Sequence, residues 1–293
     1  NLWHCLGACR TGGSAIDWVM RAEGVSFRHA VELLRADLPA AEGGAVVKRS
    51  TVRRLPAPVT PDAEDQKLLG QVVDYYHQQL KESPEGLRYL ESRGLVSPEM
   101  VDHFKLGLAN RTLGLRLPLK NRDAGAALRG RLQKLGVLRE SGHEHLAGSL
   151  VIPIHDAEGN VVGMYGRKVT PNLRPGTSLH LYLPGPHRGV FNEAELVRHK
   201  TVILCEALID ALTFWCAGFR NVTSSYGVEG FTPHHLEALK RNGIDRVLIA
   251  YDRDDAGEKA AEALGARLAA EGLDCYRVQF PRGMDANEYA LKV

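Results

Sequence analysis

Carboxylates follow two apolar segments near the end of this chain, and their spacing points to a divalent-cation site. Residues 201–205 are apolar in character and end at Glu206. Residues 247–251 lead directly into Asp252 and Asp254. If the two segments are parallel strands of one sheet, these carboxylates share the edge at which open α/β sheets bind ligands. Clustered carboxylates repel one another unless a cation neutralises them, and oxygen ligands without His or Cys favour Mg²⁺ or Mn²⁺ over zinc.

Each part of this pattern also has a plainer interpretation. An isolated Asp-x-Asp is commonly a solvated turn, and a Glu after a strand often interacts with the dipole of the next helix. Here the two groups occur in order, and Ala256 and Gly257 open a new helical segment after the Asp pair. We therefore favour the cation site.

Length and composition limit the class of protein. The 293 residues predict about two domains. No apolar stretch approaches the roughly 20 residues that cross a bilayer, and no signal peptide is visible, so we expect no membrane partner. The five scattered cysteines predict a reducing, cytoplasmic setting without a disulfide framework. Because the chain begins without Met and in mid-motif, we expect it to be a fragment or a later part of a larger protein.

Charge is unevenly distributed, although the formal net charge is only +2. Residues 111–139 contain eight cations and a single acid, Asp123, whereas acids outnumber bases from Thr201 onward. A basic lobe beside an acidic, metal-binding lobe suits a polyanionic template held near the carboxylates. The alternative is a solvated basic face without a partner.

The chain divides by pattern into four parts. Residues 1–38 predict a short knuckle and two helices capped by Ser14 and Ser26, and residues 39–61, rich in Ala, Gly and Pro, predict a linker. In residues 62–200, helices are expected first and short alternating strands later. The expected helices are 62–83, 84–93 and 98–104, and the expected strands are 113–119, 146–154, 161–169 and 179–183.

From residue 201 to residue 293, strand and helix patterns alternate. This alternation predicts a parallel sheet with helices on both faces. The expected fold class is therefore an α+β basic subdomain followed by an α/β, Rossmann-like domain.

Motifs in order along most of the chain resemble the catalytic core of bacterial-type (DnaG-like) DNA primases, including their topoisomerase-primase (TOPRIM) domain. Asp252-Arg253-Asp254-Asp255-Ala256-Gly257 takes the place of the family's D-x-D-x-A-G, and Gly163-Met164-Tyr165-Gly166-Arg167 that of G-F-x-G-R. The segments that carry the resemblance are residues 86–95, 104–107, 151–167, 204–210, 252–257 and 283–288.

The resemblance implies roles for the carboxylates. Glu206, Asp252 and Asp254 would be catalytic and would hold Mg²⁺ or Mn²⁺. Asp210, one helical turn after Glu206, is expected to face the same site, and Asp285 to help hold a second ion. Two residues beyond Asp285 the family usually has Asp; Asn287 here would keep an oxygen ligand and lose a charge.

The resemblance also implies that the phosphates of nucleotide and template are bound by cations of the middle lobe, residues 62–200. Arg167 and Lys168 directly follow the glycine-containing strand pattern, and Arg188 would compensate for His180, which stands where the family usually has Lys. Two further cations of this lobe are expected to contribute. They are Arg129 and Arg131.

The first residues resemble the second half of the primase zinc ribbon. Cys5 and Cys9 are the candidate zinc ligands, with His4 as a substitute, but the family's upstream ligands are missing. Two thiolates do not close a structural zinc site, so Zn²⁺ is expected only if the other ligands are supplied.

The resulting hypothesis is a DNA primase that makes short RNA primers from NTPs on single-stranded DNA, with a replicative helicase as a further candidate partner. Turn sequences that depart from the replicative form favour a plasmid, phage or mobile-element setting. The alternatives are a TOPRIM nuclease and a catalytically degenerate primase-like module that binds nucleic acid.

Overall fold

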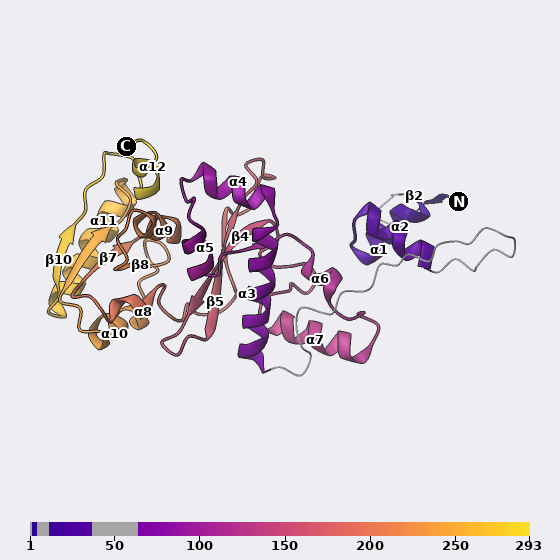
Figure 1. Ribbon diagram of the computed structural model, residues 1–293, viewed down its shortest axis with the longest axis horizontal. Coiled ribbons are helices and arrows are strands. Elements are labelled where there is room, and N and C mark those ends of the chain that lie inside the picture. The colour runs from indigo at the N-terminus through magenta and orange to yellow at the C-terminus, as the bar shows by residue number, and fades with distance from the viewer. Residues whose placement is uncertain (1, 5–11, 37–63) are drawn as a thin grey trace, which may run out of the picture. The chain divides into compact units, whose positions relative to one another are not determined.

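The computed structural model describes residues 2–4, 12–36 and 64–293 (Figure 1). Its backbone divides into two compact units, residues 1–56 and residues 57–293. The linker expected over residues 39–61 lies outside the described residues, and the domain limits drawn from the sequence remain predictions.

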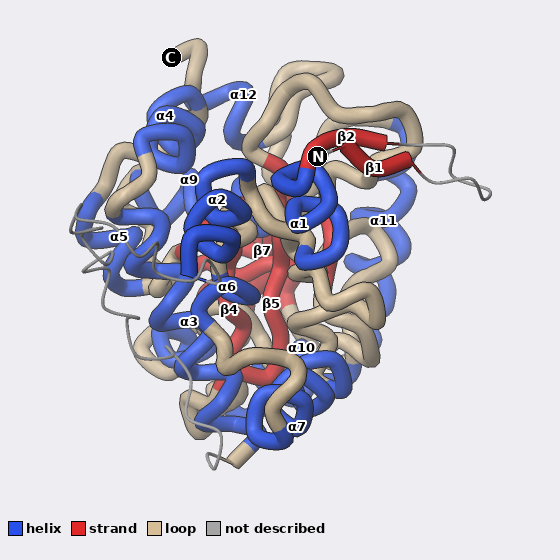
Figure 2. The backbone as a smooth tube through the Cα atoms, turned by 90° about the vertical axis from the view of Figure 1, so that its right-hand side faces the viewer, coloured by secondary structure: helices blue, strands red, loops and turns tan. Residues whose placement is uncertain are grey.

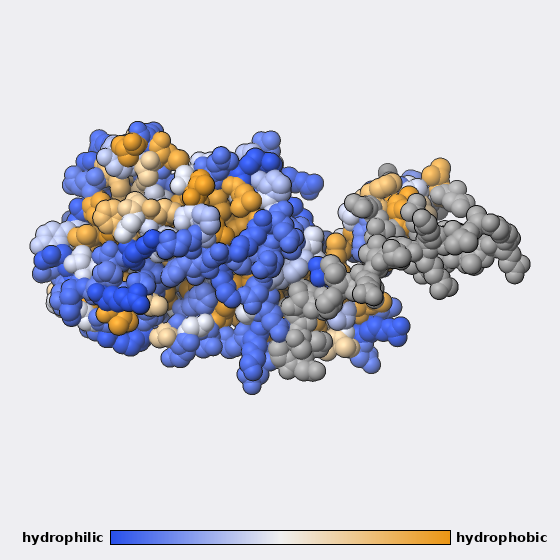
Figure 3. Space-filling view, viewed as in Figure 1, coloured by the Kyte–Doolittle hydropathy of each residue, from blue (hydrophilic) through white to orange (hydrophobic). Residues whose placement is uncertain are grey.

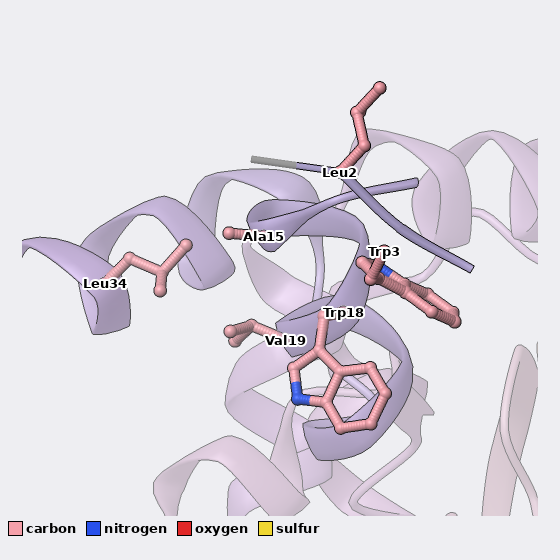
Figure 4. Close-up of a pocket in the computed structure, with 6 residues that line it drawn as sticks. All are labelled: Leu2, Trp3, Ala15, Trp18, Val19 and Leu34. Carbon is pink, nitrogen blue, oxygen red and sulfur yellow. The ribbon is translucent and has the colours of Figure 1, made fainter. Parts of the chain in front are cut away.

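The first unit is a small antiparallel hairpin followed by two helices. Strand β1 (Leu2–His4) pairs with β2 (Gly12–Ser14), and α1 (Ala15–Glu23) and α2 (Phe27–Ala36) follow. The expected caps are confirmed, since Asp17 N donates to Ser14 Oγ at 3.3 Å and His29 N donates to Ser26 Oγ at 3.4 Å. An apolar groove of about 300 Å³ lies between the hairpin and the helices (Figure 4). Its lining residues are Leu2, Trp3, Ala15, Trp18, Val19 and Leu34.

The second unit opens with three helices whose ends follow from local sequence. They are α3 (Asp65–Lys81), α4 (Pro84–Ser92) and α5 (Pro98–His103). Ser83 caps α4 by accepting from Gly86 N at 3.2 Å, and Ser97 caps α5 by accepting from Met100 N at 3.1 Å. In each case Pro occupies the first helical position, where its missing N–H costs nothing.

An antiparallel sheet in the order β3-β4-β5-β6 packs against α3. Its strands are β3 (Gly107–Ala109), β4 (Ser149–His155), β5 (Val161–Lys168) and β6 (His180–Tyr182). The strands expected at 146–154, 161–169 and 179–183 are thus confirmed, within a few residues at their ends. Gly107 is required where α3 crosses β3, because a Cβ there would meet Tyr76 Cβ at 2.6 Å.

The strand expected at residues 113–119 was a wrong prediction. The segment forms the short helix α6 (Leu113–Arg116), and α7 (Asp123–Lys134), which the pattern did not predict, follows it. Alternating leucines suggested a strand, but Leu113 and Leu117 are also four residues apart, and these two are the buried ones. Glu144 Oε1 accepts from Leu113 N at 3.0 Å and satisfies the start of the helix.

The C-terminal part is the parallel sheet that the alternating pattern predicts, in the order β10-β9-β7-β8. The strands are β7 (Thr201–Cys205), β8 (Val222–Ser224), β9 (Arg246–Ala250) and β10 (Asp274–Arg277). The helices are α8 (Glu193–Leu196), α9 (Leu208–Cys216), α10 (Pro233–Arg241), α11 (Asp255–Ala270) and α12 (Ala286–Ala290). In Figure 2, α9 and α11 lie to either side of β7. The expected fold class is confirmed.

Side-chain alternation along β7 joins the two sheets into one unit. Val202 and Leu204 belong to the cluster that includes α10 and α11, whereas Ile203 and Cys205 belong to the cluster shared with β4 and α5. In that shared cluster the ring of Phe104 stacks on that of Phe191 with centroids 4.6 Å apart. The parallel sheet is therefore fixed relative to the antiparallel one by a common core.

The face of the described residues that Figure 3 shows is mostly polar. Hydrophilic side chains cover most of the face in Figure 3, with apolar residues scattered among them. Among residues 2–4, 12–36 and 64–293, no helix has the length and apolar character that a membrane span requires.

Candidate active site

The carboxylates singled out in the sequence do meet at one edge of the parallel sheet. Strands β7 and β9 are hydrogen-bonded neighbours, and Cys205 pairs in register with Ala250. Glu206 follows the first strand directly, and Asp252 follows the second after one intervening residue. Since the strands are parallel, both acids emerge at the same carboxyl edge.

Glu206 and Asp252 each carry an oxygen that the fold leaves unsatisfied. Glu206 Oε2 and Asp252 Oδ1 are buried and have no hydrogen-bond partner among the described residues. Burial, together with the neighbouring Glu206, Asp285 and Asp254, raises the pKa of Asp252 to about 7. Burial also raises the pKa of Glu206, with a smaller contribution from Asp254. A divalent cation would give the two buried oxygens a partner, and it would also offset the repulsion between the carboxylates.

Two other acids of the group have a structural task as well. Asp254 caps α11 by accepting from Gly257 N at 2.7 Å, and Asp285 caps α12 by accepting from Glu288 N at 2.6 Å. Within the described part of the chain, no three Asp, Glu, His or Cys side chains are grouped closely enough to hold an ion. The acids are thus neighbours around one edge rather than a closed ligand shell.

Asp210 is buried in the first turn of α9, where its Oδ1 accepts from Asn287 N at 3.1 Å. Burial, followed by the charges of Asp285 and Asp252, raises its pKa well above the usual range. Asp210 therefore lies within electrostatic reach of Asp285 and Asp252.

A basic cleft of about 620 Å³ lies between α4 and the end of β5. Arg167 and Lys168, both expected to bind phosphate, line it together with Arg88 and Arg93 of the α4 region. Arg167 Nη1 donates to His180 Nε2 at 2.8 Å, which requires that ring nitrogen to be unprotonated. Burial and the charge of Arg167 lower the pKa of His180, so the positive charge here belongs to Arg167.

Comparison with known proteins gives the family of this site. The family model for the N-terminal domain of the DNA primase catalytic core matches residues 75–197, and the Toprim-like model matches residues 203–290. The chain belongs to the DnaG-type primase family.

Curated primases match nearly the whole chain. The DNA primase of Aquifex aeolicus is 28% identical over 301 residues, which cover 99% of this chain and 56% of the relative. That of Helicobacter pylori is 30% identical over 290 residues, covering 92% of this chain and 47% of the relative. This DnaG-type chain thus spans about half the length of these relatives.

Solved primase structures share the fold. The zinc-binding and RNA polymerase domains of the Aquifex aeolicus primase align with a TM-score of 0.66 and 25% identity over 99% of this chain and 70% of that one. A DnaG primase catalytic domain bound to single-stranded DNA aligns with a TM-score of 0.64 and 24% identity over 78% of this chain and 76% of that one. The latter likeness supports the fold of the DnaG-type core.

Within this DnaG-type core, the structure gives several expected site residues other partners. Arg129 Nη2 donates to the carbonyls of Gly114 and Pro118 at 2.8 and 3.3 Å, so it supports α6. Arg131 forms an ion pair with Asp65 at 2.7 Å. Arg188 is exposed in the loop after β6, outside the residues that line the basic cleft. The candidate zinc ligands Cys5 and Cys9 lie outside the described residues.

The expectation that Asn287 keeps a metal-directed oxygen needs correction. Its Nδ2 donates to the Arg93 carbonyl and to Thr213 Oγ1, both at 2.8 Å, and its Oδ1 accepts from Arg93 Nη1 at 3.3 Å. With both ends of the amide bonded and the side chain buried, Asn287 joins α12 to α4 and α9.

Arg277 is a supporting residue that the sequence did not reveal. From β10 its Nη1 donates to the Tyr251 carbonyl at 2.8 Å and its Nη2 to the Asp252 carbonyl at 3.0 Å. It also forms an ion pair with Glu258 at 3.3 Å. The guanidinium thus fixes the backbone that carries the acidic pair. No local motif marks Arg277, and none marks Arg88 on α4 and Arg93 at its C-terminal cap as lining residues of the cleft.

Proposed function

We propose that this chain is the catalytic core of a DNA primase that joins nucleoside triphosphates into short RNA primers on single-stranded DNA. The observation that carries the proposal is the pair of buried, unpartnered oxygens on Glu206 and Asp252 at adjacent strand ends. The family of the chain and the DNA-bound primase domain of similar fold support the template.

In this proposal Glu206, Asp252 and Asp254 would hold Mg²⁺ or Mn²⁺, although the described side chains do not form a closed ligand set without the ion, and Asp285 and Asp210 complete the acidic surroundings. When bound, such ions lower the pKa of an attacking hydroxyl and offset charge that develops on phosphate oxygens. The orphan oxygens of Glu206 and Asp252 are the acceptors available for direct coordination. Asp210 accepts from Asn287 N and so ties α9 to α12 beside this acidic group.

Cations of the chain bind and orient the polyanionic reactants. Arg167 and Lys168, with Arg88 and Arg93 beside them, form a cleft large enough for several phosphates. Arg188 is proposed as a further contact to nucleotide phosphates. Because Arg129 and Arg131 are held by other groups of the fold, any contact they make with the template would be peripheral.

The finer assignments rest on the sequence. The His180-Leu181-Tyr182-Leu183-Pro184 sequence in place of the replicative form supports a plasmid, phage or mobile-element primase. A replicative helicase is the proposed partner and the cytoplasm the proposed location. Zinc would bind Cys5 and Cys9 only with two further ligands, a proposal that the zinc-binding domain of the Aquifex aeolicus relative supports.

A primer-synthesis assay tests the proposal. The chain with Mn²⁺, a single-stranded template and labelled NTPs should yield short oligomers, and Asp252→Asn should reduce the yield at least about a hundredfold through loss of an ion ligand. Asp245→Asn is the matched control, because Asp245 is exposed at the opposite end of the same strand. Template degradation without NTPs would indicate a nuclease instead, and absence of any product from parent and variant alike would overturn the proposal.

A further inference from the structure

The turn at residues 225–227, which follows β8, is bonded to both segments that carry the proposed ion ligands. Gly227 N donates to the carbonyl of Glu206 at 2.8 Å. The hydroxyl of Tyr251, which directly precedes the acidic pair, donates to Ser225 Oγ at 2.7 Å. The position of this turn is therefore fixed relative to the carboxylate edge.

Tyr226 occupies this turn in a conformation that non-glycine residues seldom adopt. Its φ is 65°, in the left-handed region, and its side chain is only 6% exposed. A bulky residue retained in this region costs stability, and such strain is commonly associated with a functional constraint. The ring of Tyr226 lies against Tyr182 and His187 of the neighbouring subdomain.

Tyr226 contacts the residues on both sides of Arg188. Its hydroxyl donates to the Gly189 carbonyl at 3.2 Å, and its ring centroid lies 5.6 Å from that of His187. Tyr182 closes the same aromatic group, with its ring centroid 4.4 Å from that of His187.

The loop that carries Arg188 is confined on its other side as well. Gly189 has a φ of 76°, and a Cβ there would meet the His155 carbonyl oxygen at 2.3 Å. Val190 N donates to that same carbonyl at 3.3 Å. The loop is thus held between the end of β4 and Tyr226, and only Arg188 projects from it as an exposed charge.

We propose that Tyr226 is a positioning residue, which holds Arg188 at a fixed place relative to Glu206 so that Arg188 binds the triphosphate of the incoming nucleotide. The inference rests on the proposed primase function and adds a specific coupling to it. The turn that contains Tyr226 contacts both Glu206 and the loop that carries Arg188. It therefore keeps these two parts of the site at a constant distance from each other. Tyr226 acts through Arg188 and does not itself touch the reacting atoms.

Tyr226→Phe tests the coupling because it removes only the hydroxyl and keeps the ring. We expect KM for NTP to rise about three- to tenfold, as for loss of one hydrogen bond, while the Mn²⁺ dissociation constant changes less than about twofold. Tyr276→Phe is the matched control, since Tyr276 is 55% exposed on β10, and it should leave both quantities unchanged. An equal loss of Mn²⁺ affinity in Tyr226→Phe would overturn the proposal, because the turn would then act on the ion site.

A double-mutant cycle with Arg188→Ala separates positioning from general packing. If Tyr226 acts through Arg188, Tyr226→Phe adds nothing to KM in the Arg188→Ala background. His187→Ala, a change in a half-buried loop residue, should raise KM similarly and be equally silent in that background. Full effects of both changes in the Arg188→Ala background would refute the positioning role.

Nucleotide binding distinguishes failure of this inference from failure of the proposed function. The affinity for a fluorescent NTP in the presence of Mn²⁺ can be measured whether or not primers are made. A parent chain that binds the NTP but makes no primer would overturn the proposed function, and the same variants would then test Tyr226 by affinity. A parent chain that binds no NTP would overturn both.

Discussion

Asn287 and Arg93 bond each other twice although 194 residues separate them along the chain. Asn287 Nδ2 donates to the Arg93 carbonyl at 2.8 Å, and Arg93 Nη1 donates to Asn287 Oδ1 at 3.3 Å. The contact links α12, which contains Asn287, with the end of α4, the helix that forms one wall of the basic cleft. Removing it should affect stability first, since the amide is 1% exposed and all of its bonds are internal.

Asn287→Ala should lower the free energy of unfolding by about 2 kcal/mol, because it leaves the Arg93 carbonyl and Thr213 Oγ1 without their buried partner. Urea denaturation measures the change. Asn160→Ala is the control, because Asn160 is exposed in the β4–β5 turn, and it should cost less than about 1 kcal/mol. Equal effects of the two changes would contradict the role given to Asn287.

The ion-free protein should lose stability as pH rises through the titration of Asp252. Its folded pKa of about 7 lies above the ordinary value of 3.8 for an aspartic acid, so the folded state binds the proton more tightly than the unfolded state does. The contribution to stability that is present at low pH therefore disappears between about pH 4 and 7. Asp252→Asn should therefore raise the free energy of unfolding at pH 8, without ions, by about 1–3 kcal/mol.

Addition of Mn²⁺ provides the complementary measurement. The ion must displace the Asp252 proton, so its stabilising effect on the thermal midpoint should be larger at pH 8 than at pH 6. Asp252→Asn should abolish most of this stabilisation, whereas Asp245→Asn should retain it. A midpoint that Mn²⁺ leaves unchanged at both pH values would exclude the ion site.

His235 should limit stability at acidic pH. Its ring is buried and bonded to Thr232 and to the Ser224 carbonyl, and burial lowers its pKa to about 4 from 6.5. Because the unfolded chain binds the proton more readily, stability is lost as pH falls from about 6.5 through 4. The loss from this group should reach at most about 3 kcal/mol.

His235→Gln, which cannot be protonated, should flatten this part of the stability profile, although it lowers stability at pH 7. His234→Gln serves as the control because His234 is exposed on the same helix. An unchanged slope between pH 6.5 and 4 in His235→Gln would assign the acid sensitivity to other groups.

Arg277→Lys should weaken Mn²⁺ binding about tenfold although Arg277 contacts no proposed ligand oxygen. A lysine cannot bridge the carbonyls of Tyr251 and Asp252 at once, and support of this kind typically changes ion affinity ten- to a hundredfold. Isothermal titration calorimetry measures the affinity. Arg246→Lys changes an exposed arginine on β9 and should leave the Mn²⁺ affinity unchanged. If Arg277→Lys bound Mn²⁺ as tightly as the parent chain, Arg277 would have no supporting role.

Charge in the basic cleft should govern the salt dependence of template binding. Arg167→Ala and Arg88→Ala should each weaken binding of single-stranded DNA and reduce the slope of log K against log salt by about 0.7, because each arginine neutralises about one phosphate. Fluorescence anisotropy over a salt series measures this slope. Lys259→Ala, which removes an exposed cation of α11, is the control, and equal slopes in all variants would place the template elsewhere.

The sequence alone determined the carboxylate edge and the class of fold. Residues 201–205 and 247–250 are short apolar runs separated by helical patterns, and this local alternation dictates parallel strands whose ends coincide. Glu206 and Asp252 therefore share one edge for reasons contained in the local pattern, whereas the strand order that makes β7 and β9 neighbours was decided by the tertiary structure. The same reasoning placed Asp210 one turn away, because the helical period is local.

Tertiary packing decided what each polar side chain does. Arg129 and Arg131 appear equivalent to other cations in the sequence, but neighbouring carbonyls and Asp65 engage them. Arg277 and Asn287 act through partners far away in the chain. The segment that begins at Leu113 forms a helix instead of the expected strand, with Leu113 and Leu117 buried. Periodicity reports only local conformation, whereas hydrogen-bond partners and desolvation depend on segments that meet once the chain has folded.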